Sequence, residues 1–182
     1  MNAMSDVEVP NDRPTNWKAI AMIAVCTAVI AFIVASLEKG SDGSIGKALP
    51  EFRPAGWIDD KALTAEQMQD KVLVVDAWAS WCGPCIAETK HLVDVYGKFG
   101  ENPRLQFVGI TMEQEDALPN MKMFIERLHV PWPNAYGAEA FFQELGINTI
   151  PRVYVVNSKG EIIWSNTVGG DIEDAIQRAL AM

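Results

Sequence analysis

The sequence predicts an α/β domain with a central mixed β-sheet flanked by helices, preceded by one apolar N-terminal helix. Two observations predict the domain: short β-branched runs alternate with amphipathic stretches, and the last two apolar runs are separated only by a tight turn. A third predicts the N-terminal helix, because a long stretch near the start of the chain has no charged residue. The 182 residues are enough for one domain with its own core and an anchor.

The N-terminal region is predicted to contain a short polar tail (1–16), a transmembrane helix (17–38) and a linker (39–50). The nineteen residues from Ala19 to Leu37 carry no charge, and a helix of that length spans roughly 28 Å, close to the ~30 Å hydrocarbon core of a bilayer. We expect a retained signal anchor instead of a cleaved signal peptide, because no small-x-small site follows the span. Lys and Arg flank it on both sides, so charge alone does not set its orientation.

The domain is predicted to occupy residues 51–182, and its elements follow from the spacing of apolar residues. β-branched runs predict strands and apolar residues at helical spacing predict helices. In chain order we expect a short helix (Ala65–Asp70), a strand (Val72–Val75), a helix (Cys85–Phe99), a strand (Leu105–Thr111), two helices (Leu118–Leu128, Ala138–Leu145), two strands (Arg152–Val156, Glu161–Ser165) and a last helix (Asp171–Leu180). The turn Ser158-Lys159-Gly160 joins the last two strands as a hairpin, so the sheet is expected to be mixed.

The pentapeptide Trp81-Cys82-Gly83-Pro84-Cys85 stands where the first strand turns into a helix. Two cysteines at this spacing can exchange electrons through one reversible disulfide. At a helix N-cap, free backbone N–H groups and the helix dipole lower a thiol pKa from about 8.5 to ~3.5–7.5, so Cys82 is the predicted nucleophile. Cys85, one turn further, is expected to be more buried and to resolve the mixed disulfide. Gly83 lets a substrate backbone approach, and Pro84 suits the first helical turn.

Half of a four-ligand zinc site has the same cysteine spacing, so the other candidate ligands matter. Cys26 lies inside the apolar stretch, and His91 and His129 are isolated from each other and from any cysteine. We therefore expect no metal and no cofactor. The net charge of −9 disfavours nucleic acid as a partner, because a phosphate-binding face needs clustered Lys and Arg.

The segment from Val74 to Cys85, VVDAWASWCGPC, resembles the active-site strand and helix of the thioredoxin superfamily. Ile150-Pro151 before the strand at 152–156 resembles the cis-proline loop of that superfamily. The anchor, Trp57 and the closing stretch 157–163 together resemble the TlpA/ResA branch of bacterial extracytoplasmic thioredoxin-like proteins. The resemblance covers about residues 49–182 and implies a thioredoxin-like fold.

The resemblance also implies roles for two carboxylates. Asp76 matches a buried aspartate that helps to move the proton of the resolving cysteine, although its usual lysine partner is replaced by Gly109. A buried acid with a raised pKa is suited to general-base work near neutrality. Glu88 matches the acidic residue of the branch pattern, although Thr89 stands where a proline is typical; an exposed helix residue is the alternative for Glu88.

Around the cysteines, the resemblance implies substrate contacts. Trp81 is expected to be a partly exposed shield over the sulfurs, whereas Trp78 is expected in the core. A cis bond at Ile150–Pro151 would bring Pro151 to the cysteines and leave the backbone of Ile150 free to pair with an extended substrate strand beside Cys82.

The Gly-Pro dipeptide between the cysteines lacks the histidine of oxidants and isomerases, so it indicates a reductant. The resemblance implies a domain outside the bacterial cell membrane, in the periplasm or extracytoplasmic space. It also implies oxidised protein substrates such as apocytochrome c, and a membrane thiol donor of the DsbD/CcdA type. Two alternatives stay open: a disulfide oxidant or isomerase, and a thiol-based copper-binding assembly factor.

Overall fold

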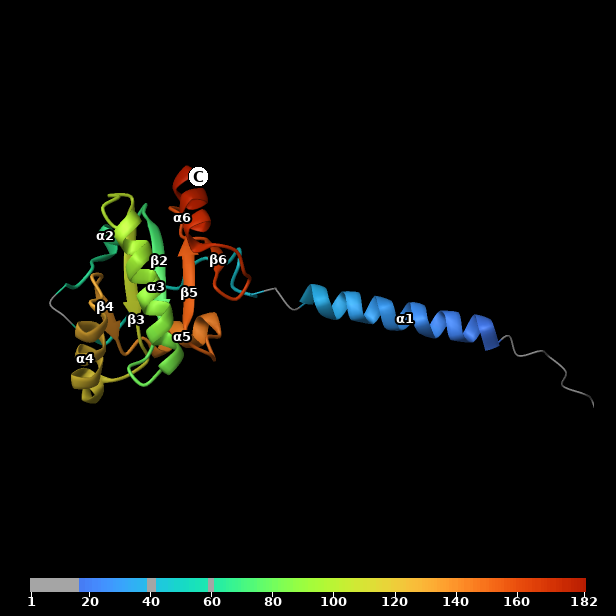
Figure 1. The fold of residues 1–182 in the computed structure, drawn as a ribbon. Helices are drawn as coiled ribbons and strands as arrows, with labels where there is room; N and C mark the ends of the chain where they lie inside the picture. The colour runs from blue at the N-terminus through green and yellow to red at the C-terminus, as the bar shows by residue number, and fades with distance from the viewer. Residues whose placement is uncertain (1–16, 39–41, 59–60) are drawn as a thin grey trace, which may run out of the picture. The chain divides into compact units, whose positions relative to one another are not determined.

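The computed structural model describes residues 17–38, 42–58 and 61–182, and the chain divides into two units, Met1–Lys39 and Gly40–Met182 (Figure 1). The first unit contains helix α1 (Trp17–Glu38), at the bounds that the sequence predicts. The predicted tail (1–16) and residues 39–41 of the predicted linker lie outside the described residues. Among the residues that are described, no helix is long and apolar enough to cross a membrane, so the structure does not show the predicted transmembrane helix.

Residues 42–50 are held against the sheet, whereas the sequence predicts them as linker. Ala48 forms an antiparallel β-bridge with Glu161. The Gly46 N–H donates a hydrogen bond to the Ile162 carbonyl at 2.8 Å. Backbone pairing of this kind leaves no pattern of side chains in the sequence, and the Gly and Ser content of the segment is typical of a flexible tether. The domain therefore begins earlier than residue 51.

A six-stranded mixed sheet forms the centre of the domain, in the order β1-β4-β3-β2-β5-β6. Its strands are β1 (Gly56–Trp57), β2 (Val72–Ala77), β3 (Leu105–Ile110), β4 (Asn134–Tyr136), β5 (Arg152–Val156) and β6 (Ile162–Ser165). β2, β3 and β4 run parallel, whereas β1 pairs antiparallel with β4, β5 with β2, and β6 with β5. The predicted mixed sheet is confirmed. The sequence did not predict β1 and β4, which are too short to show a period.

Helices lie on both faces of this sheet, as predicted (Figure 1). They are α2 (Ala65–Met68), α3 (Gly83–Phe99), α4 (Leu118–Leu128), α5 (Glu139–Leu145) and α6 (Ile172–Ala181), with a 3₁₀ turn η1 (Glu115–Ala117) before α4. One hydrophobic cluster packs α3, α4 and α6 on one face, and a second packs α5 on the other. Every predicted element of the domain is present, with bounds within two residues of those observed.

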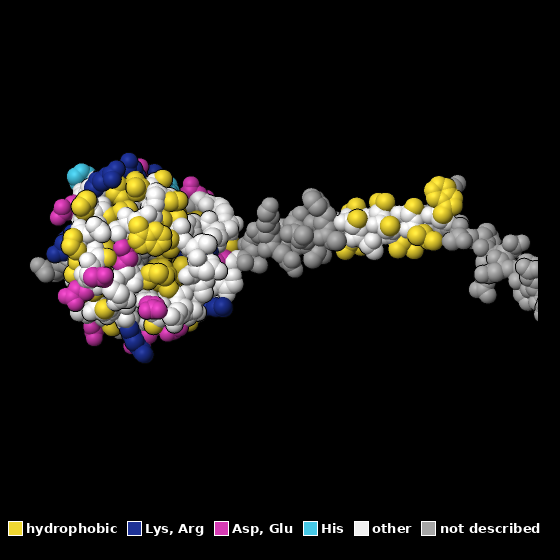
Figure 2. Space-filling view, turned by 90° about the horizontal axis from the view of Figure 1, so that it is seen from below, with side chains coloured by type: hydrophobic (Ala, Val, Ile, Leu, Met, Phe, Trp, Pro, Cys, Tyr) yellow, Lys and Arg dark blue, Asp and Glu magenta, His cyan; other side chains and the backbone are white. Residues whose placement is uncertain are grey.

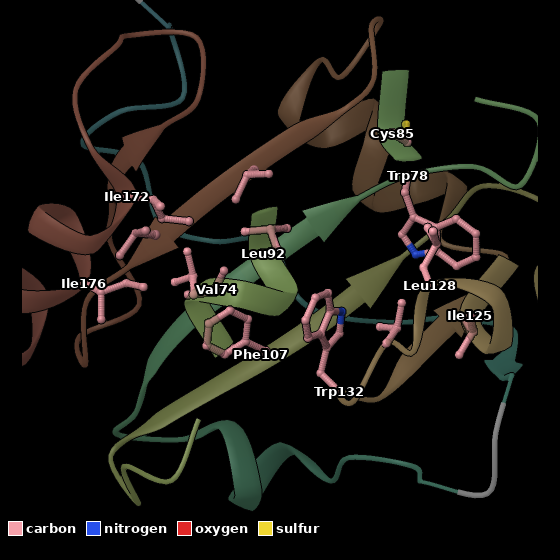
Figure 3. Close-up of a cluster of buried hydrophobic side chains, with 14 of the residues drawn as sticks. Val74, Trp78, Cys85, Leu92, Phe107, Ile125, Leu128, Trp132, Ile172 and Ile176 are labelled. Carbon is pink, nitrogen blue, oxygen red and sulfur yellow. The ribbon is translucent and has the colours of Figure 1, made fainter. Parts of the chain in front are cut away.

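Successive side chains of strand β2 point into the two hydrophobic clusters in turn, and this alternation decides which face of the sheet carries the site. Val72 and Val74 belong to the cluster with α3, while Leu73 and Val75 belong to the cluster with α5. Alternation places the side chain of Asp76 on the α3 face. Trp78 follows in the same series and lies in the core beside Leu128 (Figure 3), where its ring stacks on that of Phe124.

Candidate active site

Cys82 and Cys85 form a disulfide where the loop after β2 enters α3. Cys82 is the N-cap residue, as the sequence predicts, and its Sγ accepts a hydrogen bond from the Cys85 N–H at 3.2 Å. Cys85 is fully buried, whereas 3 % of Cys82 is exposed. Once the disulfide is reduced, the N–H groups of the first turn can stabilise a thiolate at Cys82. The outer position of Cys82 suits attack, and the inner position of Cys85 suits resolution.

The other residues of the pentapeptide surround the disulfide at the surface. Trp81 is 70 % exposed, and Gly83 and Pro84 are exposed too. A Cβ built on Gly83 has no atom within 4 Å, so a substrate backbone has room to approach there. Pro84 lies in the first turn of α3, where its missing N–H leaves no helical hydrogen bond unmade.

Asp76 is a buried acid without a full set of partners. It is 2 % exposed, and its Oδ1 accepts no hydrogen bond. Burial, and secondarily the negative charge of Glu88, raise the pKa of Asp76 from 3.8 to about 8. A carboxyl group with this pKa exchanges its proton near neutral pH, which is what general acid–base work requires.

Glu88 lies on α3, one turn beyond Cys85, and is half-buried. Its charge raises the pKa of Asp76, so the two carboxylates are close enough to interact through space. The structure therefore brings the acid of β2 and the acid of α3 together on the face that carries Cys85. This differs from the exposed helix residue that was the alternative for Glu88.

The space beside Asp76 is filled from β4. Gly109 pairs with Asp76 in the sheet, and a Cβ added to Gly109 would lie 1.8 Å from Asn134 Oδ1. That oxygen accepts a hydrogen bond from Trp78 Nε1 at 3.1 Å, and the Asn134 amide donates to the Trp132 carbonyl at 2.7 Å. Asn134 therefore excludes any side chain at position 109, including the lysine that the family pattern places there.

The Ile150–Pro151 peptide bond is cis, as the resemblance implies. β5 pairs with β2 so that Arg152 lies opposite Ala77, and the residue before Arg152 therefore lies beside the end of β2, where the cysteine loop begins. Ile150 packs against the hydrophobic cluster that contains both cysteines. The structure thus brings this loop to the side of the active-site loop.

A groove of about 310 Å³ adjoins Trp81. Its lining comes from the active-site loop, from α3 and from α4: Ser80, Trp81, Ile86, Asn120, Met123, Phe124, Arg127 and Leu128. Met123 is 62 % exposed, so two large apolar side chains of this groove, Trp81 and Met123, are open to solvent. Figure 2 shows hydrophobic side chains gathered on the domain surface, with Asp and Glu side chains among them.

Sequence reasoning missed Glu113, which follows β3 and contacts the active-site loop. Its carboxylate accepts hydrogen bonds from the Ser80 N–H and the Ser80 hydroxyl, both at 2.6 Å. A glutamate after a strand has no distinctive pattern, and its partner lies 33 residues earlier in the chain. Only the fold brings the two together.

Comparison with known proteins decides the family. The model of the Redoxin family matches residues 44–180, which is more than half of the chain. The chain belongs to the Redoxin family.

Two relatives align with most of this chain. It is 22 % identical over 168 residues to the thiol-disulfide oxidoreductase ResA of Oceanobacillus iheyensis, an alignment that covers 90 % of this chain and 81 % of the relative. It is 24 % identical over 169 residues to the thiol:disulfide interchange protein DsbE of Haemophilus influenzae, covering 86 % and 88 %. The predicted assignment to ResA-like proteins of the thioredoxin superfamily is confirmed.

Solved structures agree on the fold. A thiol-disulfide isomerase from Corynebacterium glutamicum superposes with a TM-score of 0.61 at 17 % identity, covering 73 % of this chain and 94 % of that one. A thiol-disulfide oxidoreductase from Bacteroides fragilis gives 0.60 at 18 % identity, covering 74 % and 99 %. Together, the fold, the Cys82–Cys85 pair and the relatives identify a thiol-disulfide oxidoreductase.

Proposed function

We propose that this Redoxin protein is a membrane-tethered, extracytoplasmic reductant of protein disulfides. The observation that carries the proposal is the Cys82–Cys85 disulfide at the N-cap of α3, with only Gly83 and Pro84 between the two cysteines. The potential of such a pair depends on how strongly the reduced thiolate is stabilised, and it ranges from about −270 mV in thioredoxin to about −120 mV in a strong periplasmic oxidant. A Gly-Pro dipeptide, without histidine, favours the reducing end of that range.

The reaction proceeds in two exchanges. In the reduced enzyme, the Cys82 thiolate attacks one sulfur of a substrate disulfide, forming a mixed disulfide and releasing the other substrate sulfur as a thiolate. Cys85 then loses its proton and attacks Cys82 Sγ, which releases the second substrate thiolate. Two electrons have passed to the substrate, whose thiolates take up protons, and Cys82 and Cys85 are left as the disulfide seen in the structure.

Asp76 is the proposed acceptor of the Cys85 proton. Its side chain is on the α3 face of the sheet, and its pKa of about 8 matches proton transfer from a thiol near neutral pH. The negative charge of Glu88 contributes to the raised pKa of Asp76, so the proposed role of Glu88 is electrostatic. Pro151 and Ile150, beside the same loop, would receive the backbone of the substrate.

The substrates are proposed to be oxidised proteins, with apocytochrome c as one candidate. Names of the relatives, thiol-disulfide oxidoreductase ResA and thiol:disulfide interchange protein DsbE, support the chemistry. A reductant that works where disulfides persist must be recharged by reducing equivalents from elsewhere. We therefore propose a membrane thiol transporter of the DsbD/CcdA type as its electron donor.

The membrane tether is supported by the sequence. The stretch from Ala19 to Leu37 has no charge, and the exposed side chains of α1 include large apolar ones such as Ile20 and Ile30. A single-pass anchor in the bacterial cell membrane would hold the domain in the periplasm or extracytoplasmic space. In cell fractionation, the full-length chain should stay in the membrane pellet after a high-salt wash and require detergent for release.

The potential of the Cys82–Cys85 pair tests the proposed direction of electron flow. It can be measured by equilibrating the protein with glutathione or dithiothreitol buffers and trapping the thiols. A value near −270 mV supports the reductant, whereas a value near −120 mV would make the protein an oxidant or isomerase. In the same preparation, Cys82→Ser should abolish disulfide reduction, and Cys85→Ser should accumulate mixed disulfides.

A further inference from the structure

We propose that Glu113 is a positioning residue that clamps the active-site loop and thereby fixes the Trp81 wall of the substrate groove. The inference rests on the proposed function, because it concerns how a protein substrate is received beside Cys82. Glu113 lies on the segment that follows β3, outside the pentapeptide and outside the pair of acids on the α3 face.

The clamp consists of the two hydrogen bonds that Ser80 donates. Its backbone N–H donates to Glu113 Oε2 and its hydroxyl to Glu113 Oε1, each at 2.6 Å. Hydrogen bonds to an ionised carboxylate are shorter and stronger than those between neutral groups. One side chain therefore uses both of its oxygens on a residue that stands two positions before Cys82.

Glu113 is itself held at the end of the sheet. Its N–H donates to Thr111 Oγ1 at 3.2 Å, and that hydroxyl donates back to Glu113 Oε2 at 3.3 Å. The Glu113 carbonyl accepts from the Gly137 N–H at 2.8 Å, just after β4. Thr111 is fully buried, and its own N–H donates to the carbonyl of Ala135 at 3.0 Å. The clamp therefore connects the active-site loop to the ends of β3 and β4, which pair with each other in the central sheet.

The loop needs such an anchor because Trp81 has little packing of its own. With 70 % of Trp81 exposed, its position depends on the backbone of Ser80 and Cys82. Ser80 and Trp81 both line the groove beside α4. Releasing Ser80 from Glu113 would free this wall, while the disulfide and α3 behind it stay packed in the core.

The clamp predicts a different effect on two kinds of substrate. Glu113→Ala should lower kcat/KM for reduction of a protein disulfide, with oxidised insulin as the probe, by about tenfold, mainly through a higher KM. The rate with hydroxyethyl disulfide, which is too small to fill the groove, should change less than about twofold. The midpoint of thermal unfolding, measured alongside, reports any general loss of structure.

Three further variants separate the geometry of the clamp from its charge. Glu113→Gln should keep most of the activity, because its amide can accept from the Ser80 N–H and donate to the Ser80 hydroxyl. Ser80→Ala should lose part of it, and the pair Ser80→Ala with Glu113→Ala should cost no more than Glu113→Ala alone. Glu115→Ala, an exposed acid two residues along the same segment, is the matched control and should behave as wild type.

The clamp is refuted if Glu113→Ala leaves the KM for insulin unchanged, or slows both substrates equally. Equal losses of activity in Glu113→Gln and Glu113→Ala would show that the charge of Glu113 is what matters. That result would also overturn the proposed clamp. These outcomes are distinct from failure of the proposed function, in which the wild-type protein itself would not reduce insulin.

Discussion

Asp42 is a half-buried acid and Asp76 a fully buried one, and their pKa values shift in opposite directions. Asp42 lies in the N-terminal segment of the domain, and its side chain is 9 % exposed beside Arg152. Burial raises its pKa, but hydrogen bonds from Ser165, Ser44 and Thr167 outweigh burial and hold that pKa well below its usual range. Asp76 is buried more deeply, at 2 % exposed, has an Oδ1 without a hydrogen-bond partner, and has a pKa raised to about 8.

The difference shows that hydrogen-bond donors can outweigh burial at a half-buried carboxylate, whereas a deeply buried one with few donors becomes a weak acid. The Asp42 oxygens accept from the Ser44 N–H at 2.9 Å, the Thr167 hydroxyl at 2.8 Å and Arg152 Nη1 at 2.9 Å. A carboxylate with this many donors stays ionised and fixes the parts that it joins. A buried carboxyl group with too few hydrogen-bond donors around it stays protonated until a base or a rise in pH removes the proton. Such a group is suited to catalytic proton transfer.

Removing Asp42 should have the largest effect on stability. Asp42→Ala leaves the Arg152 guanidinium, whose side chain is 13 % exposed, without its counter-ion, and we expect a loss of about 3 kcal/mol in the free energy of unfolding. Urea denaturation followed by tryptophan fluorescence measures it. Asp116→Ala, at an exposed acid, serves as the control. A loss below about 0.5 kcal/mol would show that the Asp42 network does not hold the segment.

Asp76→Asn should affect the chemistry more than the fold. An amide cannot accept the Cys85 proton, so we expect the resolving step to slow by about 100-fold at pH 7, within the range for general-base catalysis. Rapid quenching of a reaction with oxidised insulin would show the mixed disulfide persisting. Asp94→Asn on the exposed side of α3 is the control. A resolving rate equal to that of wild type would remove Asp76 from the mechanism.

The two acids also show what a sequence can predict. Asp76 stands out because a charged residue interrupts an apolar strand, and the cysteine pair and its N-cap are similarly local features. Asp42 stands in a stretch whose Gly and Ser content predicts a linker, and its partner Arg152 lies 110 residues away. Glu113 and Ser80 are likewise joined only by the fold. Local periodicity predicts elements, whereas polar contacts between distant segments depend on packing that no local pattern records.

The two pKa shifts predict opposite dependences of stability on pH. The pKa of Asp42 is lowered by folding, so its contribution is present above about pH 4 and is lost as the pH falls further. The pKa of Asp76 is raised, so its contribution is complete below about pH 4 and is lost as the pH rises through about 8. Between pH 5 and pH 9, wild type should lose about 4 kcal/mol more than Asp76→Asn, because the folded acid stays protonated over about three pH units in which the unfolded one is ionised. Parallel stability curves for the two proteins, from denaturation at each pH, would contradict the raised pKa.

Glu88→Gln should give the smallest effect, because Glu88 acts on Asp76 only through its charge. Burial is the main cause of the raised pKa of Asp76 and is untouched by this substitution, while the secondary contribution of Glu88 disappears. The pH midpoint of the resolving step should therefore move down by less than about one unit, with a rate change at pH 7 of about threefold or less. Stopped-flow measurement of resolution from pH 5 to pH 9 follows the midpoint, and Asp94→Asn again controls for a lost charge on α3. An upward movement of the midpoint would mean that Glu88 stabilises the ionised form of Asp76, and an unmoved midpoint would mean that burial alone sets its pKa.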